Sequence, residues 1–469
     1  MALSLCMQLA IVASLVYASR RSLENALPVF CFFLVLMPLE SQVPVPGLCD
    51  LTTMRFSIVT LLILYFVKGE RNIREPLPLK NLMLLHVFWV AISTAYSLSF
   101  TTSAKQLLSQ VVEYYLLYFL LVSIITNVDT IHRMLFASVM AMTLCCLFGI
   151  VEVYAHWSIL HIFPADQWIT YNGGVNPLFT EWGRGLRIRA TFPHPILFGD
   201  ALAMSIPITL YLLSIWEHQW RRTLLWIALP LLFWAIYKTS SRGPWLGTAL
   251  CCVLLFIVNG NSVRKYLVII GITSVLVLLA RPGIWSTIDG LYVSSTDSAT
   301  PVGASYLYRD ALDQAVRNAV AKDTGRFLFG YGLGTFREIG LDINFLGRLH
   351  RWRTCDNNWA AFLYETGYGG LLLIGALLFK ALWIAVRSYR SLPKPGNLLD
   401  GMLFVVLGGF YFLLLSVAGY SWGQQGYLAW ILISIIVSHS RIAPESDFGE
   451  DSEALEDITP EKIYDLSAA

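Results

Sequence analysis

The chain of 469 residues is too apolar for a soluble globular protein, because 56% of its residues are hydrophobic, 14% are charged and the mean hydropathy is +0.61. The net charge of +2 is uninformative, since in a membrane protein the distribution of Lys and Arg between loops carries the information. The chain has no CxxC pair, no His/Cys cluster and no Walker motif. We therefore expect a membrane protein with no metal, no cofactor and no nucleic-acid partner.

Taken in order, the chain contains about thirteen apolar stretches, judged against the roughly 20 residues that cross a bilayer. The first could be mistaken for a signal peptide, but it lacks a basic n-region and a clear cleavage site. The pattern predicts an all-α polytopic membrane protein with 12 or 13 transmembrane helices. The stretches centre near 2–18, 26–38, 51–67, 81–98, 107–126, 131–154, 195–215, 223–238, 243–258, 265–280, 357–386, 401–418 and 425–438.

Basic residues cluster on alternate connections between these stretches, as at Arg20-Arg21, Arg221-Arg222 and Arg264-Lys265. By the positive-inside rule, those connections are cytoplasmic. The chain then divides into transmembrane parts at 1–154, 195–280 and 357–438, and two outer loops at 155–194 and 281–356. The acidic tail, 439–469, falls in the cytoplasm and has little apolar content to bury, which predicts disorder.

The second outer loop contains ASYLYRDALDQAVRNAVAKD (304–323), in which apolar residues recur at helical spacing with charge on the other face. This pattern predicts an amphipathic helix on or near the membrane surface. Its apolar positions are Leu307, Ala311, Leu312, Ala315, Val316 and Val320.

The stretch that follows joins this loop to an apolar span, as FGYGLGTF and then DNNWAAFLYETGYGGLLLI. It places Asp356, Asn357 and Asn358 where the chain enters lipid. A carboxylate with two amides at a membrane boundary can hold and deprotonate a polar substrate, and flanking glycines let backbone approach a ligand.

Three arginines from separate segments fall on the outer face of the predicted topology. Arg189 precedes the seventh span, Arg242 lies in the turn TSSRGPWLG, and Arg309 opens the amphipathic helix. Guanidinium groups pair bidentately with phosphate oxygens, so together they could clamp an anion. The alternative for each is a boundary arginine that reaches headgroups or pairs with a structural acid. Arg242 is the strongest candidate, because a charge in a tight turn between apolar helices needs a cavity.

Four carboxylates lie in the outer parts of predicted spans, where we expect structural partners of the arginines more than catalytic groups. They are Glu113, Glu152, Asp200 and Glu365.

Two histidines are further candidates. His194, in FPHP, is expected to be a turn or hydrogen-bonding residue, with catalysis as the alternative. His350, in GRLHRWRT, is surrounded by cations that disfavour its protonation, and it is a reserve base. Cys49 and Cys355 both fall in predicted outer loops, so a disulfide between them is one alternative, although the sequence does not show that they are close.

The order RATFPHPILFG, TSSRGPWLG, a loop helix opening with Arg309, FGYGLGTF and DNNWAAFLYETGYGGLLL, over residues 185–380, resembles the bacterial O-antigen ligase and polymerase superfamily. The resemblance implies a multi-span enzyme of the bacterial inner membrane, with a periplasmic active site and a cytoplasmic C-terminus. Such an enzyme transfers glycan from undecaprenyl diphosphate to an acceptor hydroxyl, without metal or cofactor.

The resemblance also implies roles for individual residues. The family's arginines in the SR turn and outer loop bind the lipid diphosphate, which corresponds to Arg242 and Arg309; Arg189, or its neighbour Arg187, is a further match. Ligases of the family carry His-Asn before an ExG. Here Glu365-Thr366-Gly367 sets the register, and Asp356 stands in the His position. Asp356 is then the base, and His194, His350, Asn357 and Asn358 are expected to contact substrate.

Asp in place of the ligase His favours an exopolysaccharide or O-antigen polymerase, and a single displacement would invert the anomeric configuration. The expected partners are the bilayer, the lipid-linked glycan, a chain-length regulator and a flippase. One alternative is an O-antigen ligase that transfers glycan to lipid A core or protein. Another is a transporter or flippase of lipid-linked glycans, in which membrane carboxylates and arginines form a substrate path.

Overall fold

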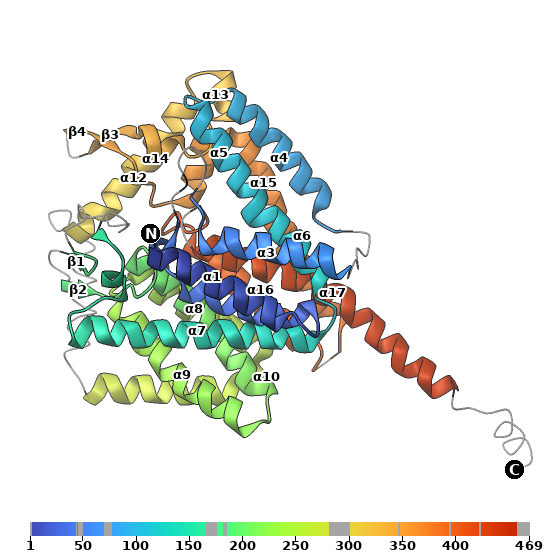
Figure 1. The fold of residues 1–469 in the computed structure, drawn as a ribbon. Coiled ribbons are helices and arrows are strands. Elements are labelled where there is room, and N and C mark those ends of the chain that lie inside the picture. Colours follow the sequence, from blue (N-terminus) through green and yellow to red (C-terminus); the bar gives the residue numbers. More distant parts are fainter. Residues whose placement is uncertain are drawn as a thin grey trace, which may run out of the picture.

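The structure of the protein is a computed structural model. It describes residues 2–43, 45, 50–69, 77–165, 176–181, 185–280, 301–345, 348–393, 395–421 and 424–456. Long helices pack side by side, and the short helices and hairpins of the predicted outer loops gather at the end of the bundle away from the C-terminus (Figure 1).

The N-terminal part is built from seven α-helices joined by short helical turns. The α-helices are α1 (Ala2–Ala18), α2 (Ala26–Leu36), α3 (Thr53–Lys68), α4 (Lys80–Ala95), α5 (Phe100–Gln110), α6 (Leu117–Ile124) and α7 (Val128–Tyr154). The 3-10 turns are η1 (Leu23–Asn25), η2 (Leu39–Ser41) and η4 (Ile159–Ile162), and a π-helix, η3 (Val111–Leu116), joins α5 to α6.

The central and C-terminal parts add six long helices. These are α8 (Pro195–Ile215), α9 (Gln219–Lys238), α10 (Arg242–Ala280), α15 (Asn358–Ser391), α16 (Leu398–Leu413) and α17 (Gln424–Glu456). Every apolar stretch in the sequence overlaps a helix. The stretches at 243–258 and 265–280 both fall in α10, which bends at Asn259, where φ −116° and ψ 23° leave the helical region.

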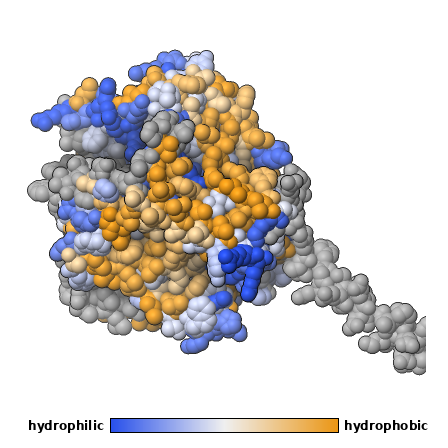
Figure 2. Space-filling view, viewed as in Figure 1, coloured by the Kyte–Doolittle hydropathy of each residue, from blue (hydrophilic) through white to orange (hydrophobic). Residues whose placement is uncertain are grey.

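The chain is an all-α protein with helices suited to a bilayer. Within the described residues, five helical stretches are long and apolar enough to cross a membrane: Phe100–Ile124, Val128–Tyr154, Pro195–Ile215, Arg242–Ile272 and Asn358–Ser391. Shorter apolar helices are Ala2–Ala18, Leu23–Leu36, Lys80–Ala95 and Leu398–Leu413. Large apolar side chains such as Val67 and Phe88 point outward, and Figure 2 shows apolar residues covering much of one side of the bundle. The total of 12 or 13 spans stays a prediction.

Helix α8 forms the centre of the bundle. It packs against α7, α9, α10 and α16, and 94% of its most apolar stretch of 18 residues is buried. Gly199 allows close contact with the first turn of α10, because a Cβ atom there would lie 2.6 Å from Pro244 Cγ. The TSSRG turn that carries Arg242 is therefore fixed against the most buried helix of the fold.

The predicted outer loops contain more secondary structure than the expected amphipathic helix. The first holds the hairpin β1 (Phe179–Glu181) and β2 (Gly185–Arg187). The second holds α12 (Pro301–Val320), α13 (Thr324–Phe329), α14 (Thr335–Ile339) and a second hairpin, β3 (Leu341–Phe345) and β4 (Arg348–Trp352). In this hairpin Leu341 pairs with Trp352 and Ile343 with His350.

Helix α12 confirms the predicted amphipathic helix, and its apolar face is covered by protein. Leu312, Val316 and Val320 are completely buried, in a cluster with Ile343 of β3 and Ala360 of α15. Leu307 is 38% exposed and does not belong to this buried face. The apolar face therefore packs against protein, and a position of α12 on or near the membrane surface stays a prediction.

The C-terminal helix α17 continues to Glu456, so it enters the acidic tail. Disorder of the tail, 439–469, stays a prediction. Residues 457–469 lie outside the described residues.

Candidate active site

Helix α15 breaks at Gly367, and the loop of the FGYGLGTF motif binds across the break. Gly367 has φ 66° and ψ −174°. The amides of Tyr331 and Gly332 donate to the carbonyls of Tyr364 (2.9 Å) and Glu365 (2.8 Å). A helix that breaks leaves carbonyls without helical partners, and the loop supplies those partners.

The other side of the loop contacts α5 and the turn before it. The amide of Leu98 donates to the carbonyl of Tyr331 at 3.1 Å, and Ser103 Oγ donates to the carbonyl of Leu333 at 2.9 Å. Gly332 has φ 100°, and a Cβ atom there would lie 2.2 Å from Ser97 Oγ. The glycines of the motif therefore allow the loop to fit between α15 and the start of α5.

Glu365 has a structural role in this junction. Its carboxylate accepts hydrogen bonds from the backbone amides of Gly334 and Phe336, at the start of α14. The expected arginine partner is replaced by backbone donors, which satisfy a buried carboxylate equally well.

The other three carboxylates are also placed within the bundle. Glu113 pairs with Arg55 (Oε1 to Nε, 2.5 Å), an arginine that the sequence analysis did not single out. Glu152 accepts from the amide of Arg189 at 2.9 Å. Asp200 is 1% exposed, and its Oδ1 has no hydrogen-bond partner among the described residues.

Asp356 and Arg309 face each other just before α15. Asp356 Oδ2 lies 3.9 Å from Arg309 Nη2, and both side chains are 33% exposed. Burial raises the pKa of the Asp356 carboxyl, and the charge of Arg309 opposes this shift. Arg309 Nη2 also donates to the carbonyl of Ser416 at 3.2 Å. Its Nε is buried without a hydrogen-bond acceptor in the described part of the chain.

The turn that carries Arg242 meets the same point of the fold. A Cβ atom on Gly243 would lie 2.9 Å from Ser416 Oγ, so the start of α10 touches the residue that binds Arg309. Ser240 in this turn adopts φ 48°, a conformation that side-chain-bearing residues rarely take. The elements that carry Arg309 and Arg242 therefore both contact Ser416, and Asp356 faces Arg309.

Asn357 and Asn358 hold the start of α15. Asn357 caps the helix by accepting from the amide of Trp359 at 3.0 Å, and its Nδ2 donates to Asp313 Oδ1 at 3.2 Å. Burial raises the pKa of Asp313, and this hydrogen bond opposes the shift. Asn358 is fully buried, and its Oδ1 accepts from the amide of Tyr420 at 3.1 Å. Asn358 thus ties α15 to the connection between α16 and α17.

Arg187 and Arg189 are held inside the protein. Arg187 Nε donates to the carbonyl of Thr239 at 2.9 Å and its Nη2 donates to Ser241 Oγ at 2.7 Å, so it fixes the TSSRG turn. Arg189 is 1% exposed and donates to the carbonyls of Pro177 (2.9 Å) and Pro193 (3.0 Å). Burial lowers the pKa of Arg189, and the charges of Glu40 and Glu152 oppose this shift. These contacts suit positioning more than contact with substrate.

The two candidate histidines also have different surroundings. His194 caps α8, because its Nδ1 accepts from the amide of Ile196 at 3.1 Å. His350 is exposed on β4, where its ring lies 6.2 Å from that of Trp352. Cys355 is a buried free cysteine, and Cys49 lies outside the described residues.

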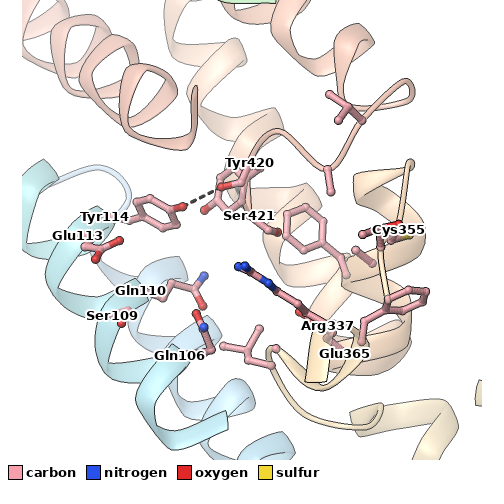
Figure 3. Close-up of a pocket in the computed structure, with 18 of the residues that line it drawn as sticks. Gln106, Ser109, Gln110, Glu113, Tyr114, Arg337, Cys355, Glu365, Tyr420 and Ser421 are labelled. Carbon is pink, nitrogen blue, oxygen red and sulfur yellow. Dashed lines mark hydrogen bonds between the residues drawn. The ribbon is translucent and has the colours of Figure 1, made fainter. Parts of the chain in front are cut away.

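A cavity of about 230 Å³ opens beside Asp356, and we call it the Arg337 cavity. Its wall comes from α3, α5, η3, α14, α15, α17, the segment 353–356 before α15, and the connection between α16 and α17. Figure 3 shows the guanidinium of Arg337 reaching into it toward Gln110 and Ser421. Its lining includes Arg55, Gln106, Gln110, Glu113, Tyr114, Arg337, Arg353, Asp356, Phe362, Glu365, Tyr420 and Tyr427.

Most residues of this cavity were not predicted from sequence. Residues more than 200 positions apart in the chain meet in it, as Gln110 and Arg337 do, and no short motif joins them. Within the described residues, no group of three or more His, Cys, Asp or Glu side chains could hold a metal ion.

No protein-family model matches the chain, and no curated protein matches it.

Proposed function

We propose that the chain is a membrane glycosyltransferase that polymerises a surface polysaccharide. It transfers glycan from undecaprenyl diphosphate to a sugar hydroxyl on the periplasmic side of a bacterial inner membrane. The observation that carries this proposal is the pairing of Asp356 with Arg309 at 3.9 Å, beside a cavity and next to the turn of Arg242. This arrangement sets a carboxylate base next to cations that suit a diphosphate.

The proposed reaction is a single displacement at the anomeric carbon. The acceptor hydroxyl oxygen forms a bond to that carbon, while the bond from the carbon to the phosphate oxygen breaks. The diphosphate leaves with the electron pair, and the hydroxyl proton moves to Asp356. The anomeric configuration inverts, and the step itself requires no metal.

Arg309 and Arg242 serve the leaving group in this scheme. Charge grows on the diphosphate as the bond breaks, and preorganised cations stabilise that charge. The buried Nε of Arg309 has no acceptor among the residues described, and a phosphate oxygen would satisfy it. The charge of Arg309 favours the charged, basic form of Asp356 and opposes the rise in its pKa that burial causes.

The structure of the outer segment supports a role for positioning as well. The carboxylate of Asp356 is followed by the cap at Asn357 and by Asn358, which is bonded to the connection after α16. A base fixed by such contacts needs little rearrangement during the reaction.

The test is transfer by the purified full chain in nanodiscs, with an undecaprenyl-diphosphate-linked repeat unit and no ion gradient. We expect longer lipid-linked glycan, and loss of roughly 10²–10⁴-fold in rate for Asp356→Asn. Arg309→Ala and Arg242→Ala should each cost roughly 10²–10³-fold. Arg351→Ala is the matched control, because Arg351 pairs with Asp342 on the exposed β3–β4 hairpin at 2.7 Å.

The alternatives give different products in the same experiment. Transfer only to lipid A core or to protein would identify a ligase, and deletion of its gene would leave free long chains instead of single repeat units. Movement of the lipid-linked glycan without new glycosidic bonds would identify a transporter. Unchanged transfer in all three variants would refute the assigned site.

A further inference from the structure

We infer that the Arg337 cavity is the acceptor subsite of the proposed reaction and that it selects a sugar carrying a carboxylate. This inference rests on the proposed function. Asp356 lines the cavity, whereas Arg242 and Arg309, both in the described part of the chain, do not. The proposed base therefore stands between the cavity and the cations assigned to the diphosphate. A hydroxyl that Asp356 deprotonates would enter from the cavity side.

The wall of the cavity suits a sugar ring. It presents the aromatic rings of Tyr114, Phe362 and Tyr420 and the amides of Gln106 and Gln110. Aromatic faces pack against the apolar C–H face of a pyranose, and amides donate to and accept from its hydroxyls. A few placed polar groups among aromatic side chains are typical of small-ligand sites.

The carboxylates of the cavity are already bound by protein groups. Glu113 receives Arg55 at 2.5 Å and the hydroxyl of Tyr427 at 2.7 Å. Glu365 receives two backbone amides, and Asp356 faces Arg309. None of these carboxylates is left to neutralise a further cation.

Two arginines of the cavity have no such partners. The guanidinium groups of Arg337 and Arg353 make no hydrogen bond or ion pair to any of the residues that the structure describes. Both arginines are exposed. Arg337 extends into the middle of the cavity, toward Gln110 (Figure 3). A planar guanidinium forms two parallel hydrogen bonds to a carboxylate, whereas a neutral sugar would bring no counter-charge to either arginine. A uronic acid residue therefore fits this site better than a neutral hexose.

The backbone of the wall is also unusual. Glu113 and Tyr114 lie in the π-helix η3, a conformation that is rare and that occurs frequently at functional sites. Tyr114 uses its hydroxyl to bond the carbonyl of Tyr420 at 2.7 Å, which joins the two walls of the cavity. The wall around Tyr114 is thus set on a helix and fixed by this hydrogen bond.

The test measures binding to the purified full chain in nanodiscs without any donor. The probes are uronate-terminated disaccharides of the gluco, galacto and manno series and their neutral hexose counterparts. We expect at least one uronate probe to bind roughly 10- to 100-fold more tightly than its neutral counterpart. Arg337→Ala should abolish this preference and Arg337→Lys should keep part of it. Arg351→Ala, which removes an arginine outside the cavity, should keep all of it.

The outcomes distinguish failure of this inference from failure of the proposed function. Equal binding of charged and neutral probes, binding of neither, or an unchanged preference in Arg337→Ala each overturns it. The inference is also overturned if inorganic pyrophosphate displaces the uronate probe from the unsubstituted protein and from Arg242→Ala but not from Arg337→Ala. The cavity would then bind the donor phosphates. Glycan transfer without charge-selective binding refutes the acceptor site alone. Charge-selective binding without transfer refutes the proposed function and leaves the sugar site standing.

Discussion

The amide of Gly332 donates a hydrogen bond of 2.8 Å to the carbonyl of Glu365, which joins the outer segment to the break in α15. The two residues belong to separate motifs, FGYGLGTF and ETGYGG, that lie more than 30 positions apart. Because Asp356 lies in the chain between them, this bond fixes both ends of the segment that carries the proposed base. The geometry of the site therefore depends on the backbone at Gly367, where α15 breaks.

Gly367→Ala should destabilise the protein by about 1–3 kcal/mol, since the residue has φ 66° and a Cβ atom would lie 2.3 Å from the carbonyl oxygen of Leu328. Gly375→Ala is the matched control in the same helix, because a Cβ atom there meets nothing within 4 Å. Thermal unfolding in detergent, followed by circular dichroism, measures both. Equal melting temperatures for the two variants would contradict the proposed role of the break.

The pH dependence of transfer should follow the ionisation of Asp356. Burial raises its pKa, so activity should fall as the pH drops through this raised value and the carboxylate gains a proton. Arg309 opposes the shift, so Arg309→Gln should raise the pKa further and move the acid limb to higher pH, at a reduced rate. Arg309→Lys keeps the charge and should move the limb less. A pH–rate profile of each variant decides, and an acid limb that does not move in Arg309→Gln would mean that Asp356 is not the titrating base.

His194 should act as a helix cap and not as a base. Its Nδ1 accepts from the amide of Ile196 at the start of α8, a role that Asn also fills well. His194→Asn should therefore keep stability and transfer, whereas His194→Ala should lose about 0.5–2 kcal/mol of stability. Melting temperature and transfer rate are measured on both variants. Loss of transfer in a stable His194→Asn protein would instead make the imidazole catalytic.

Arg187 should affect catalysis only through the turn that it holds. It is 2% exposed and donates to Thr239 and Ser241, on the N-terminal side of Arg242. Arg187→Ala should cost about 1.5–3 kcal/mol, the range for hydrogen bonds to a charged group, and lower the rate of transfer. The exposed pair of Arg351 gives the reference, since Arg351→Ala should cost at most about 1 kcal/mol. A rate loss in Arg187→Ala with no change in stability would argue for direct contact with substrate.

The periodic parts of the chain were predictable from sequence. Apolar stretches locate the helices, and the spacing of Leu312, Val316 and Val320 locates α12, because both signals are local. Arg309 lies 3.9 Å from Asp356, whereas Arg189, expected in the same clamp, is held by the carbonyls of Pro177 and Pro193. The sequence could not show what packs against the apolar face of α12, because an apolar stripe has the same pattern whether lipid or protein covers it.

The contacts that build the site were harder to predict, because they join distant residues. Nothing in the sequence shows that Arg189 is held by the carbonyls of Pro177 and Pro193, or that Arg337 shares a cavity with Gln110. The β3–β4 hairpin had only a weak signal in the sequence, the alternation of apolar and polar residues in LDINF and RLHRW. A charged residue directly after a glycine-rich loop, as Arg337 is after GLGTF, was an unused sign of the cavity, beside the candidates Glu113, Asp356 and Glu365.

The break at Gly367 divides α15 into an outer piece, which bears the cap at Asn357 and the bonds to the FGYGLGTF loop, and a longer inner piece that ends at Ser391. A change in bilayer thickness tilts or shifts transmembrane helices at a modest cost in free energy. The inner piece can tilt about the break while the outer piece stays bonded to its neighbours. Transfer should therefore be insensitive to the acyl-chain length of the surrounding lipids, and the proposed base would keep its alignment in membranes of different composition.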